Sequence, residues 1–127
     1  MRASKTGLRK DLANQRLEIR GVDWGEMHVA REAHHQRNDL APLFKGLPGN
    51  LCTARHWGYV LKGGFLAKYK GGRKERVRAG DVYYLEPGHS VITQPGTELV
   101  EFSPQKDLAK IMKVAEKNLE GWLKGKG

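Results

Sequence analysis

Residues 79–102 read AGDVYYLEPGHSVITQPGTELVEF, and this stretch decides the fold. It holds three short runs rich in β-branched, aromatic and other apolar residues, at Val82–Leu85, Ser90–Thr93 and Glu98–Phe102. Two turns that contain Pro-Gly separate these runs, at residues 86–89 and 94–97. Short strands divided by Gly and Pro turns at this spacing are typical of an all-β barrel or sandwich.

The same pattern continues towards the N-terminus. Ala54–Leu61 is rich in aromatic and β-branched residues and predicts another strand. Phe65–Tyr69 and Lys74–Arg78 flank a Gly-Gly pair and predict a β-hairpin, and Glu26–Ala30 alternates as a further strand. We therefore predict one domain over residues 1–127, with a barrel core at about residues 22–102.

The chain outside this core has a weaker pattern. Residues 10–19 predict a short helix or an arm that leads into a strand, and residues 21–25 predict a turn. Two prolines and two glycines make residues 41–50 an irregular stretch. After Ser103-Pro104, which suits a helix start, apolar residues recur at helical spacing as far as Leu123. We expect an amphipathic C-terminal helix at about residues 104–124, packed on the barrel wall or on a second subunit.

Composition and charge exclude several classes of protein. No apolar run approaches the roughly 18 residues that cross a bilayer, so we expect no membrane protein. The basic N-terminus is followed by charged residues rather than an apolar segment, so we expect no secretory signal. Cys52 is the only cysteine, which favours a reducing compartment, and we predict a cytoplasmic location.

The net charge of +9 raises the question of nucleic-acid binding. The basic residues are scattered, with local density only at residues 73–78 and in the C-terminal segment. Their pattern favours a solvated surface, and nucleic-acid binding is the weakest of our functional alternatives. The Gly-Gly pairs lie at hairpin ends rather than between a strand and a helix, so we expect no nucleotide cofactor.

Three segments together resemble the conserved motifs and the closing strand of the cupin family: His56–Gly63, Ala79–His89 and Pro95–Phe102. The resemblance covers about residues 47–102 and implies a cupin-type double-stranded β-helix, a jelly-roll-like barrel with a central pocket. It also implies a homodimer. Cupins usually bind a divalent metal through two histidines and a glutamate in the first motif and a histidine in the second.

None of these usual ligands stands at its expected position in the motifs of this chain. The glutamate position is His56, the paired histidine positions fall on Gly49 and Leu51, and the histidine of the second motif falls on Val91. This departure argues against the dioxygenase and isomerase activities of the family, because an oxygenase iron needs a facial set of histidine and carboxylate ligands.

A different set of residues could serve as metal ligands in place of the usual cupin set. Cys52 and His56 are four residues apart and share one strand face if the strand already runs through Cys52, while His89 begins a neighbouring strand. Cysteine and two histidines suit zinc, with nickel or iron as alternatives, and water or Glu101 in a fourth position. We predict Cys52, His56 and His89 as metal ligands. The predicted pocket residues are His56, His89, Tyr59, Tyr84 and Glu101.

Each predicted ligand also has a purely structural interpretation: Cys52 as a small buried residue, His56 as a core histidine, and His89 as a turn residue.

The sequence leaves three candidate functions. The first is a cupin that binds a divalent metal or a small ligand, with or without weak enzymatic activity on an unknown substrate. The second is a non-catalytic ligand-sensing or assembly module without metal. The third, nucleic-acid binding, predicts an affinity that falls steeply with salt. The sequence leaves open whether the protein is an enzyme.

Overall fold

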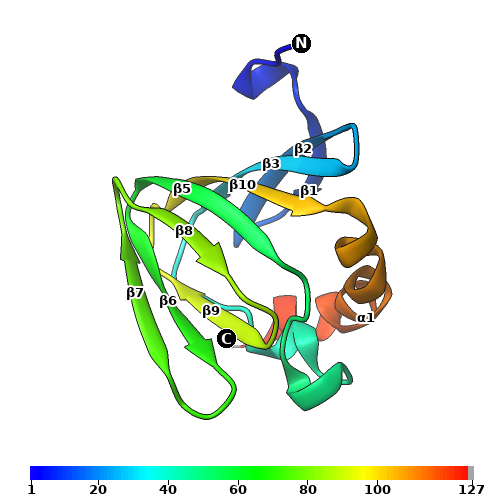
Figure 1. Ribbon diagram of the computed structural model, residues 1–127, viewed down its shortest axis with the longest axis vertical. Helices are drawn as coiled ribbons and strands as arrows, with labels where there is room; N and C mark the ends of the chain where they lie inside the picture. The colour runs from blue at the N-terminus through cyan, green and yellow to red at the C-terminus, as the bar shows by residue number, and fades with distance from the viewer. Residues whose placement is uncertain (126–127) are drawn as a thin grey trace.

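The structure, a computed structural model, describes residues 1–125 and is built mainly of antiparallel strands (Figure 1). The strands are β1 (Arg9–Ala13), β2 (Leu17–Trp24), β3 (Met27–His34), β4 (Asn38–Asp39), β5 (His56–Lys62), β6 (Gly64–Tyr69), β7 (Lys74–Arg78), β8 (Val82–Leu85), β9 (His89–Thr93) and β10 (Glu98–Pro104). Short 3-10 helices lie at η1 (Lys5–Gly7), η2 (Ala41–Phe44) and η3 (Pro48–Asn50), and the C-terminal helix is α1 (Gln105–Lys124).

The described strands form two sheets. One has the order β1-β2-β3-β10-β5-β8, and the other has the order β4-β9-β6-β7. Strand β10 lies between β3 and β5, so the last strand joins the N-terminal hairpin to the rest of the barrel. This arrangement confirms the predicted all-β barrel with a C-terminal helix.

The main core lies between the two sheets. Alternate residues of each strand point inward, and those of β5, β6, β7, β8 and β10 supply the buried cluster. Its members are Val60, Phe65, Ala67, Tyr69, Val77, Tyr83, Leu85 and Leu99. A Cβ atom at Gly58 would lie 2.4 Å from the Tyr83 hydroxyl and 2.5 Å from the Val100 carbonyl, so only glycine fits between these neighbours.

Helix α1 covers the irregular segment at one end of the barrel, beside η2 (Figure 1). Ile111 packs into a second buried cluster with Phe44, Cys52 and Ala54. Asn118 donates hydrogen bonds of 2.9 Å to the carbonyls of Leu43 and Lys45. The helix therefore holds the segment that carries Cys52 through both apolar and polar contacts.

The start of α1 differs by one residue from the prediction. Pro104 is the N-cap, and no side chain caps the helix. Ser103 belongs to β10, and its hydroxyl contacts the ring of His56. Asp107 in the first helical turn forms a two-pronged salt bridge with Arg55, with nitrogen–oxygen distances of 2.8 and 3.1 Å. This salt bridge attaches the helix to the residue before β5.

The C-terminal end of α1 is held by Arg16. The buried guanidinium lies 4.6 Å from the ring centre of Trp122 and donates hydrogen bonds to the carbonyls of Trp122 and Gly125. A cation at this end complements the helix dipole. The Trp122 indole N–H also donates to the Asp39 carbonyl at 2.8 Å.

The N-terminal predictions need correction. Residues 10–19 form no helix but most of the β1-β2 hairpin, so the six-stranded sheet begins at Arg9, well before residue 22. Gly21 lies within β2 rather than in a turn, and the chain turns after Trp24. A Cβ atom at Gly21 would approach Asp11 and His28 to within 2.6 Å, so this glycine permits close packing.

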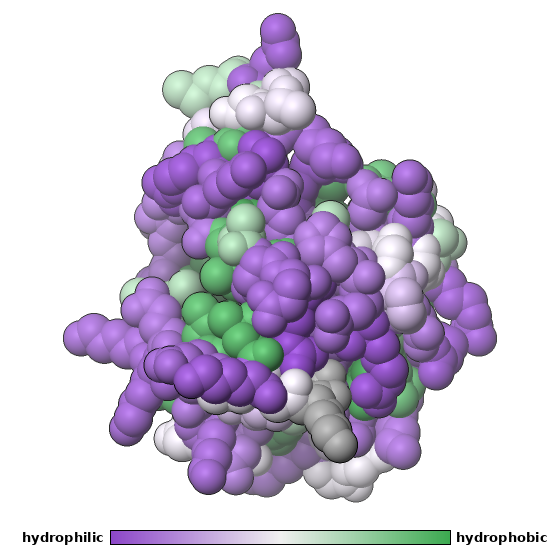
Figure 2. Space-filling model, turned by 180° about the vertical axis from the view of Figure 1, so that it is seen from behind, coloured by the Kyte–Doolittle hydropathy of each residue, from purple (hydrophilic) through white to green (hydrophobic). Residues whose placement is uncertain are grey.

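Hydrophilic residues cover most of the face seen from behind, with hydrophobic residues in small patches (Figure 2). Among residues 1–125, no helix combines the length and the apolar character that crossing a bilayer requires.

Candidate metal centre and cavity

Cys52 lies outside β5, which begins at His56, so the two residues do not share a strand face. Instead, Cys52 forms an isolated antiparallel bridge with His89, the first residue of β9. The Cys52 amide donates to the His89 carbonyl at 2.8 Å, and the His89 amide donates to the Cys52 carbonyl at 3.2 Å. A long-range backbone pairing therefore brings the two side chains together.

The side chains of Cys52, His56 and His89 converge. One potential ligand atom from each lies within 4.8 Å of the others, and all three residues are buried. Cys52 Sγ lies 3.6 Å from His56 Nε2. The two imidazole rings meet edge to face, with centroids 5.3 Å apart. Among the histidine, cysteine, aspartate and glutamate side chains of residues 1–125, these three are the ones grouped closely enough to hold a metal ion.

The second ring nitrogen of each histidine has an oxygen partner. His56 Nδ1 lies 2.6 Å from the Ser103 hydroxyl, and His89 Nδ1 lies 2.6 Å from the Glu86 carbonyl. Because a carbonyl only accepts, His89 Nδ1 carries the proton and donates it, which leaves a lone pair on Nε2. Oxygen partners of this kind orient the histidines of metal sites.

Burial shifts the pKa of each of the three groups towards the neutral form. The pKa of His56 falls to about 3 because of burial and the neighbouring His89. Burial also lowers the pKa of His89. The pKa of the Cys52 thiol rises to about 12, again mainly through burial. At neutral pH, both histidines are therefore neutral donors and Cys52 is a thiol.

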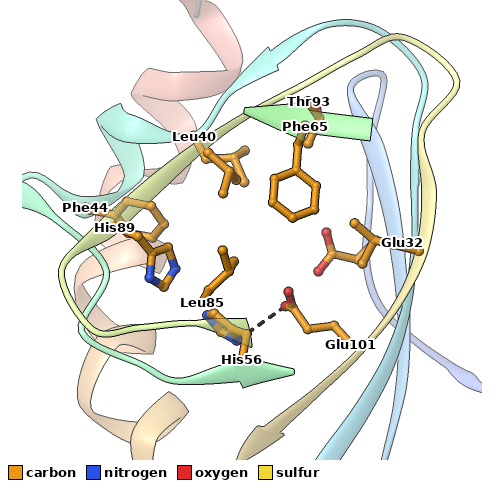
Figure 3. Close-up of a pocket in the computed structure, with 11 residues that line it drawn as sticks. Glu32, Leu40, Phe44, His56, Phe65, Leu85, His89, Thr93 and Glu101 are labelled. Atoms are coloured by element: carbon orange, nitrogen blue, oxygen red, sulfur yellow. Dashed lines mark ion pairs between the residues drawn. The ribbon is translucent and has the colours of Figure 1, made fainter. Parts of the chain in front are cut away.

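Both histidines of the cluster, His56 and His89, also line a small cavity of about 60 Å³ between the sheets (Figure 3). The remaining lining is apolar on most sides and acidic on one. Its residues are Glu32, Leu40, Phe44, His56, Phe65, Leu85, His89, Val91, Thr93, Leu99 and Glu101.

Glu32 and Glu101 form the acidic wall, and Figure 3 shows both carboxyl groups pointing into the cavity. The two carboxyl groups are hydrogen-bonded to each other, and Tyr83 donates to Glu101 at 2.8 Å. Burial and the charge of Glu32 raise the pKa of Glu101 well above its usual value. Burial alone would raise the pKa of Glu32, but the contact with His34 lowers it overall. The two pKa values are therefore pushed apart, and Glu101 is the member of the pair that takes up a proton more readily.

Glu101 Oε2 lies 3.4 Å from His56 Nδ1, the contact dashed in Figure 3. Because the pKa shifts of the two groups favour their neutral forms, this contact joins neutral groups rather than an ion pair. Glu101 meets the ring nitrogen that faces away from Cys52. The expectation that Glu101 takes the fourth ligand position is therefore corrected: it is a partner of a ligand.

Of the predicted pocket residues, His56, His89 and Glu101 line the cavity. Tyr59 and Tyr84, by contrast, are each 41% exposed on the outer face of the sheet, so their assignment to the pocket is corrected. The reason is strand alternation: His56 points inward, so Tyr59, three residues later, points outward. On β8 the same rule brings Tyr83 inward instead of Tyr84.

The sequence analysis missed Glu32 and Ser103. Glu32 lies in a polar segment that lacked a strand pattern, although β3 continues through it to His34. Ser103 was assigned to the helix start. The alternation of β10 from Glu101 could have placed Ser103 on the inner face beside it.

The fold and the cluster define a two-sheet β-barrel with a candidate metal centre. The chain superposes on an RmlC-like cupin from Shewanella frigidimarina NCIMB 400 with a TM-score of 0.57 and 14% identity, over 82% of this chain and 90% of that one. KdgF from Halomonas sp. gives a TM-score of 0.56 and 16% identity, over 83% and 95% of the two chains. The polyketide cyclase RemF from Streptomyces resistomycificus gives 0.58 and 13%, over 82% and 78%.

The chain therefore has a cupin-type fold, as its motifs indicated. At these identities the likeness establishes the fold alone. No protein-family model matches the chain, and no curated protein sequence matches it.

Proposed function

We propose that this cupin binds a divalent metal ion through Cys52, His56 and His89 and presents it to a small molecule in the barrel cavity. The observation that supports the proposal is the convergence of three buried donors, two of which, His56 and His89, line the cavity. A thiol buried beside two neutral imidazoles gains much more from a metal than from a weak S–H hydrogen bond.

The donor set fits zinc best. Zn–S bonds of about 2.3 Å and Zn–N bonds of about 2.0 Å give a sulfur–nitrogen edge of about 3.5 Å in a tetrahedron. The Cys52 Sγ to His56 Nε2 distance is 3.6 Å. Three protein ligands leave a fourth position for water or a ligand, as in catalytic zinc sites. Imidazole donors also suit nickel and iron, which remain the alternative metals.

A metal bound here would polarise a carbonyl oxygen or activate water. The protein's own residues supply the rest of the chemistry. Ser103 and Glu101 orient His56, the apolar walls exclude water, and Glu32 and Glu101 place two carboxyl groups beside the cavity. Because Cys52 must remain reduced to bind metal as a thiolate, the proposal favours a reducing compartment such as the cytoplasm.

Elemental mass spectrometry of protein purified without a tag or chelator tests the proposal. We expect near-stoichiometric zinc, nickel or iron in the wild type and loss of the metal in a Cys52→Ala, His56→Ala double variant. His35→Ala, which removes an exposed histidine, is the matched control and should keep the metal. A metal-free wild type that also fails to take up added zinc would contradict the proposal and favour the non-catalytic ligand-sensing module.

We also propose a homodimer through the outer face of the six-stranded sheet. A row of apolar residues crosses five of its strands in register, with Trp57 stacked on Tyr84 at a centroid distance of 5.0 Å. This outer row consists of Tyr84, Trp57, Phe102, Val29 and Val22. Exposed apolar patches mark interaction sites, and a two-fold dimer uses the same patch on both copies. The row carries no charge, so two basic chains can meet there without direct repulsion.

Sedimentation velocity tests the dimer. Trp57→Ser combined with Phe102→Ser removes the two central side chains of the outer row and should shift the protein to a monomer. Lys74→Ser, on the outer face of the other sheet, should leave the dimer intact. A wild type that is monomeric at high concentration would disprove this assembly.

A further inference from the structure

Strand β7 forms one edge of the four-stranded sheet and pairs only with β6 among the described strands (Figure 1). The Tyr69 amide donates to the Arg73 carbonyl at 2.8 Å, so Arg73 directs its backbone groups towards β6. The backbone groups of successive residues in an antiparallel pair point alternately towards the partner strand and away from it. Those of Lys74, Arg76 and Arg78 therefore point to the free edge.

Two of these three residues have open backbone groups. The Arg78 amide donates to the Asp81 carboxylate at 2.8 Å, and the Arg78 carbonyl accepts from the Asp81 amide at 2.9 Å. No hydrogen bond among residues 1–125 occupies the N–H and C=O groups of Lys74 and Arg76. Open groups of this kind on an exposed edge accept a further strand. The free edge at Lys74 and Arg76 is therefore a place for strand addition.

The side chains beside these open groups are basic. Val77 is buried between the sheets, so Lys74 and Arg76 point to the outer face of the four-stranded sheet. Lys68 of β6 points to the same face and lies directly opposite Lys74. Like charges directly opposite each other destabilise a sheet. A negative charge placed beside this pair would relieve the repulsion.

The three cations have no acidic partner within the described chain. Lys68, Lys74 and Arg76 are exposed, and none of them forms a salt bridge with another of residues 1–125. Glu75 lies between the two cations of β7 but points to the opposite face of the strand. Charged edges prevent unwanted pairing, and this edge repels a second copy of the basic chain. An acidic strand is attracted instead.

The geometry favours an acidic peptide over a nucleic acid. Alternate residues of an added strand repeat at the same distance as those of β7, so acidic residues at every second position lie opposite Lys74 and Arg76. A peptide also supplies both donors and acceptors to the open backbone groups. Phosphates only accept, and unpaired bases bind by stacking on aromatic side chains. The outward positions of β6 and β7 carry no aromatic residue.

We propose that an extended acidic segment of a partner protein adds to the free edge of β7 as an antiparallel strand, with Asp or Glu opposite Lys74 and Arg76. The N–H and C=O groups of these two residues bind the partner backbone, and the cations select an acidic sequence. No residue of β7 lines the cavity, so this inference does not depend on the proposed function.

Fluorescence anisotropy of labelled peptides with the full chain tests the proposal. The probe is a short peptide in which Glu alternates with Thr, and its control has the same composition with the Glu residues in one block. We expect saturable binding of the alternating peptide, at least about fivefold tighter than that of the block peptide. Equal binding of the two peptides, or no binding of either, overturns the proposal. Tighter binding of an oligouridylate of similar charge also overturns it, in favour of a nucleic acid.

N-methylation of the peptide separates backbone pairing from charge. The N–H groups of the Glu residues face β7 in the proposed pairing, and those of the Thr residues face away from it. N-methylation of the Glu residues should weaken binding at least about tenfold, because it removes these donors and blocks the approach to the edge. N-methylation of the Thr residues is the matched control and should change the affinity little. Equal effects of the two modifications overturn the proposal.

Two substitutions at Arg76 make the same separation in the protein. Arg76→Gln removes the charge and keeps the N–H, so the alternating peptide should bind about threefold more weakly. Arg76→Pro also removes the N–H, and an edge strand tolerates proline where the N–H faces solvent, so it should fold and bind at least about tenfold more weakly than the wild type. Lys113→Gln, at an exposed position of α1, is the control and should bind like the wild type.

Thermal denaturation checks that each variant is folded. Folded Arg76→Pro that binds as tightly as Arg76→Gln overturns the proposal, because charge alone would then explain the binding. If Arg76→Pro does not fold, the N-methylated peptides decide the question on the wild-type protein.

Discussion

Cys52 and His89 are joined by two backbone hydrogen bonds as well as by the proximity of their side chains. The bridge fixes the relative position of two candidate metal ligands through the main chain, and the contact with Ser103 orients the third, His56. A site held in this way exists before the metal arrives, so metal binding has little chain to order.

Metal affinity should depend on pH through a single proton. The pKa of His56 is about 3 and the pKa of Cys52 is about 12, and burial lowers the pKa of His89. Above about pH 7 both histidines are already neutral, and only the thiol loses a proton when metal binds. Zinc affinity should rise about tenfold per pH unit between about pH 7 and pH 9, as measured by competition with a chelator whose own pH dependence is known.

Cys52→Ala is the matched variant for this measurement. It should bind zinc weakly and with a nearly flat pH profile, because histidine ligands alone release no proton in this range. A wild-type slope near zero would show that the thiol is not a ligand.

Glu101→Gln should stabilise the fold increasingly as the pH rises. The folded-state pKa of Glu101 is raised by burial and by Glu32, so its contribution is fully present below its ordinary pKa of 4.5 and is lost as the pH rises towards the folded value. Glutamine has no such proton to take up. The stability difference between variant and wild type should grow above about pH 5 by up to about 1.4 kcal/mol per pH unit. Urea denaturation at several pH values measures this difference, and a constant difference would contradict the protonated state of Glu101.

Asp107→Asn should cost stability at neutral pH but not in acid. The Arg55 guanidinium lowers the pKa of Asp107 to about 2, so the contribution of the salt bridge is present above the ordinary pKa of about 4 and is lost as the pH falls towards 2. We expect a loss of about 1 kcal/mol at pH 7, because the pair is two-pronged but partly exposed. Denaturation at neutral and acid pH checks this change. Glu116→Gln, on the exposed side of the same helix, should show no such dependence.

Trp122→Ala should be the most destabilising of these changes. Trp122 is 2% exposed, lies against the Arg16 guanidinium and donates to the Asp39 carbonyl. Loss of a buried tryptophan typically costs about 3–5 kcal/mol. Met112→Ala, at a 43% exposed position of the same helix, should lower the melting temperature little. Similar melting temperatures for the two variants would show that α1 contributes little to stability.

The strands from β5 onward could be predicted because their inward positions are apolar and glycine or proline marks the turns between them. The first half of β3 was also predicted, but its continuation to His34 was not, since the inward positions Glu32 and His34 are polar and a partner such as Thr93 comes from a distant segment. Alternation assigns a face only when the inward residues differ in polarity from the outward ones.

The candidate metal site shows the same limit. The residue types of Cys52, His56 and His89 suggested a cluster, but the suggested cause, one strand carrying both Cys52 and His56, was wrong. The cluster depends on a bridge between residues far apart in the chain, which local spacing cannot reveal. Tyr59 could have been excluded at once, because the inward position of His56 fixes the direction of every later residue on β5.

The contacts between α1 and the segment around Cys52 have a consequence for folding during translation. The N-terminal part of a chain leaves the ribosome first, and a domain folds as its parts emerge. The strands and all three candidate ligands leave the ribosome before α1, yet Asn118 and Ile111 are needed to hold the neighbouring segment in place. A ribosome-bound chain that ends before residue 105 should therefore form barrel strands but bind zinc poorly, and competence for the metal should appear only late in translation.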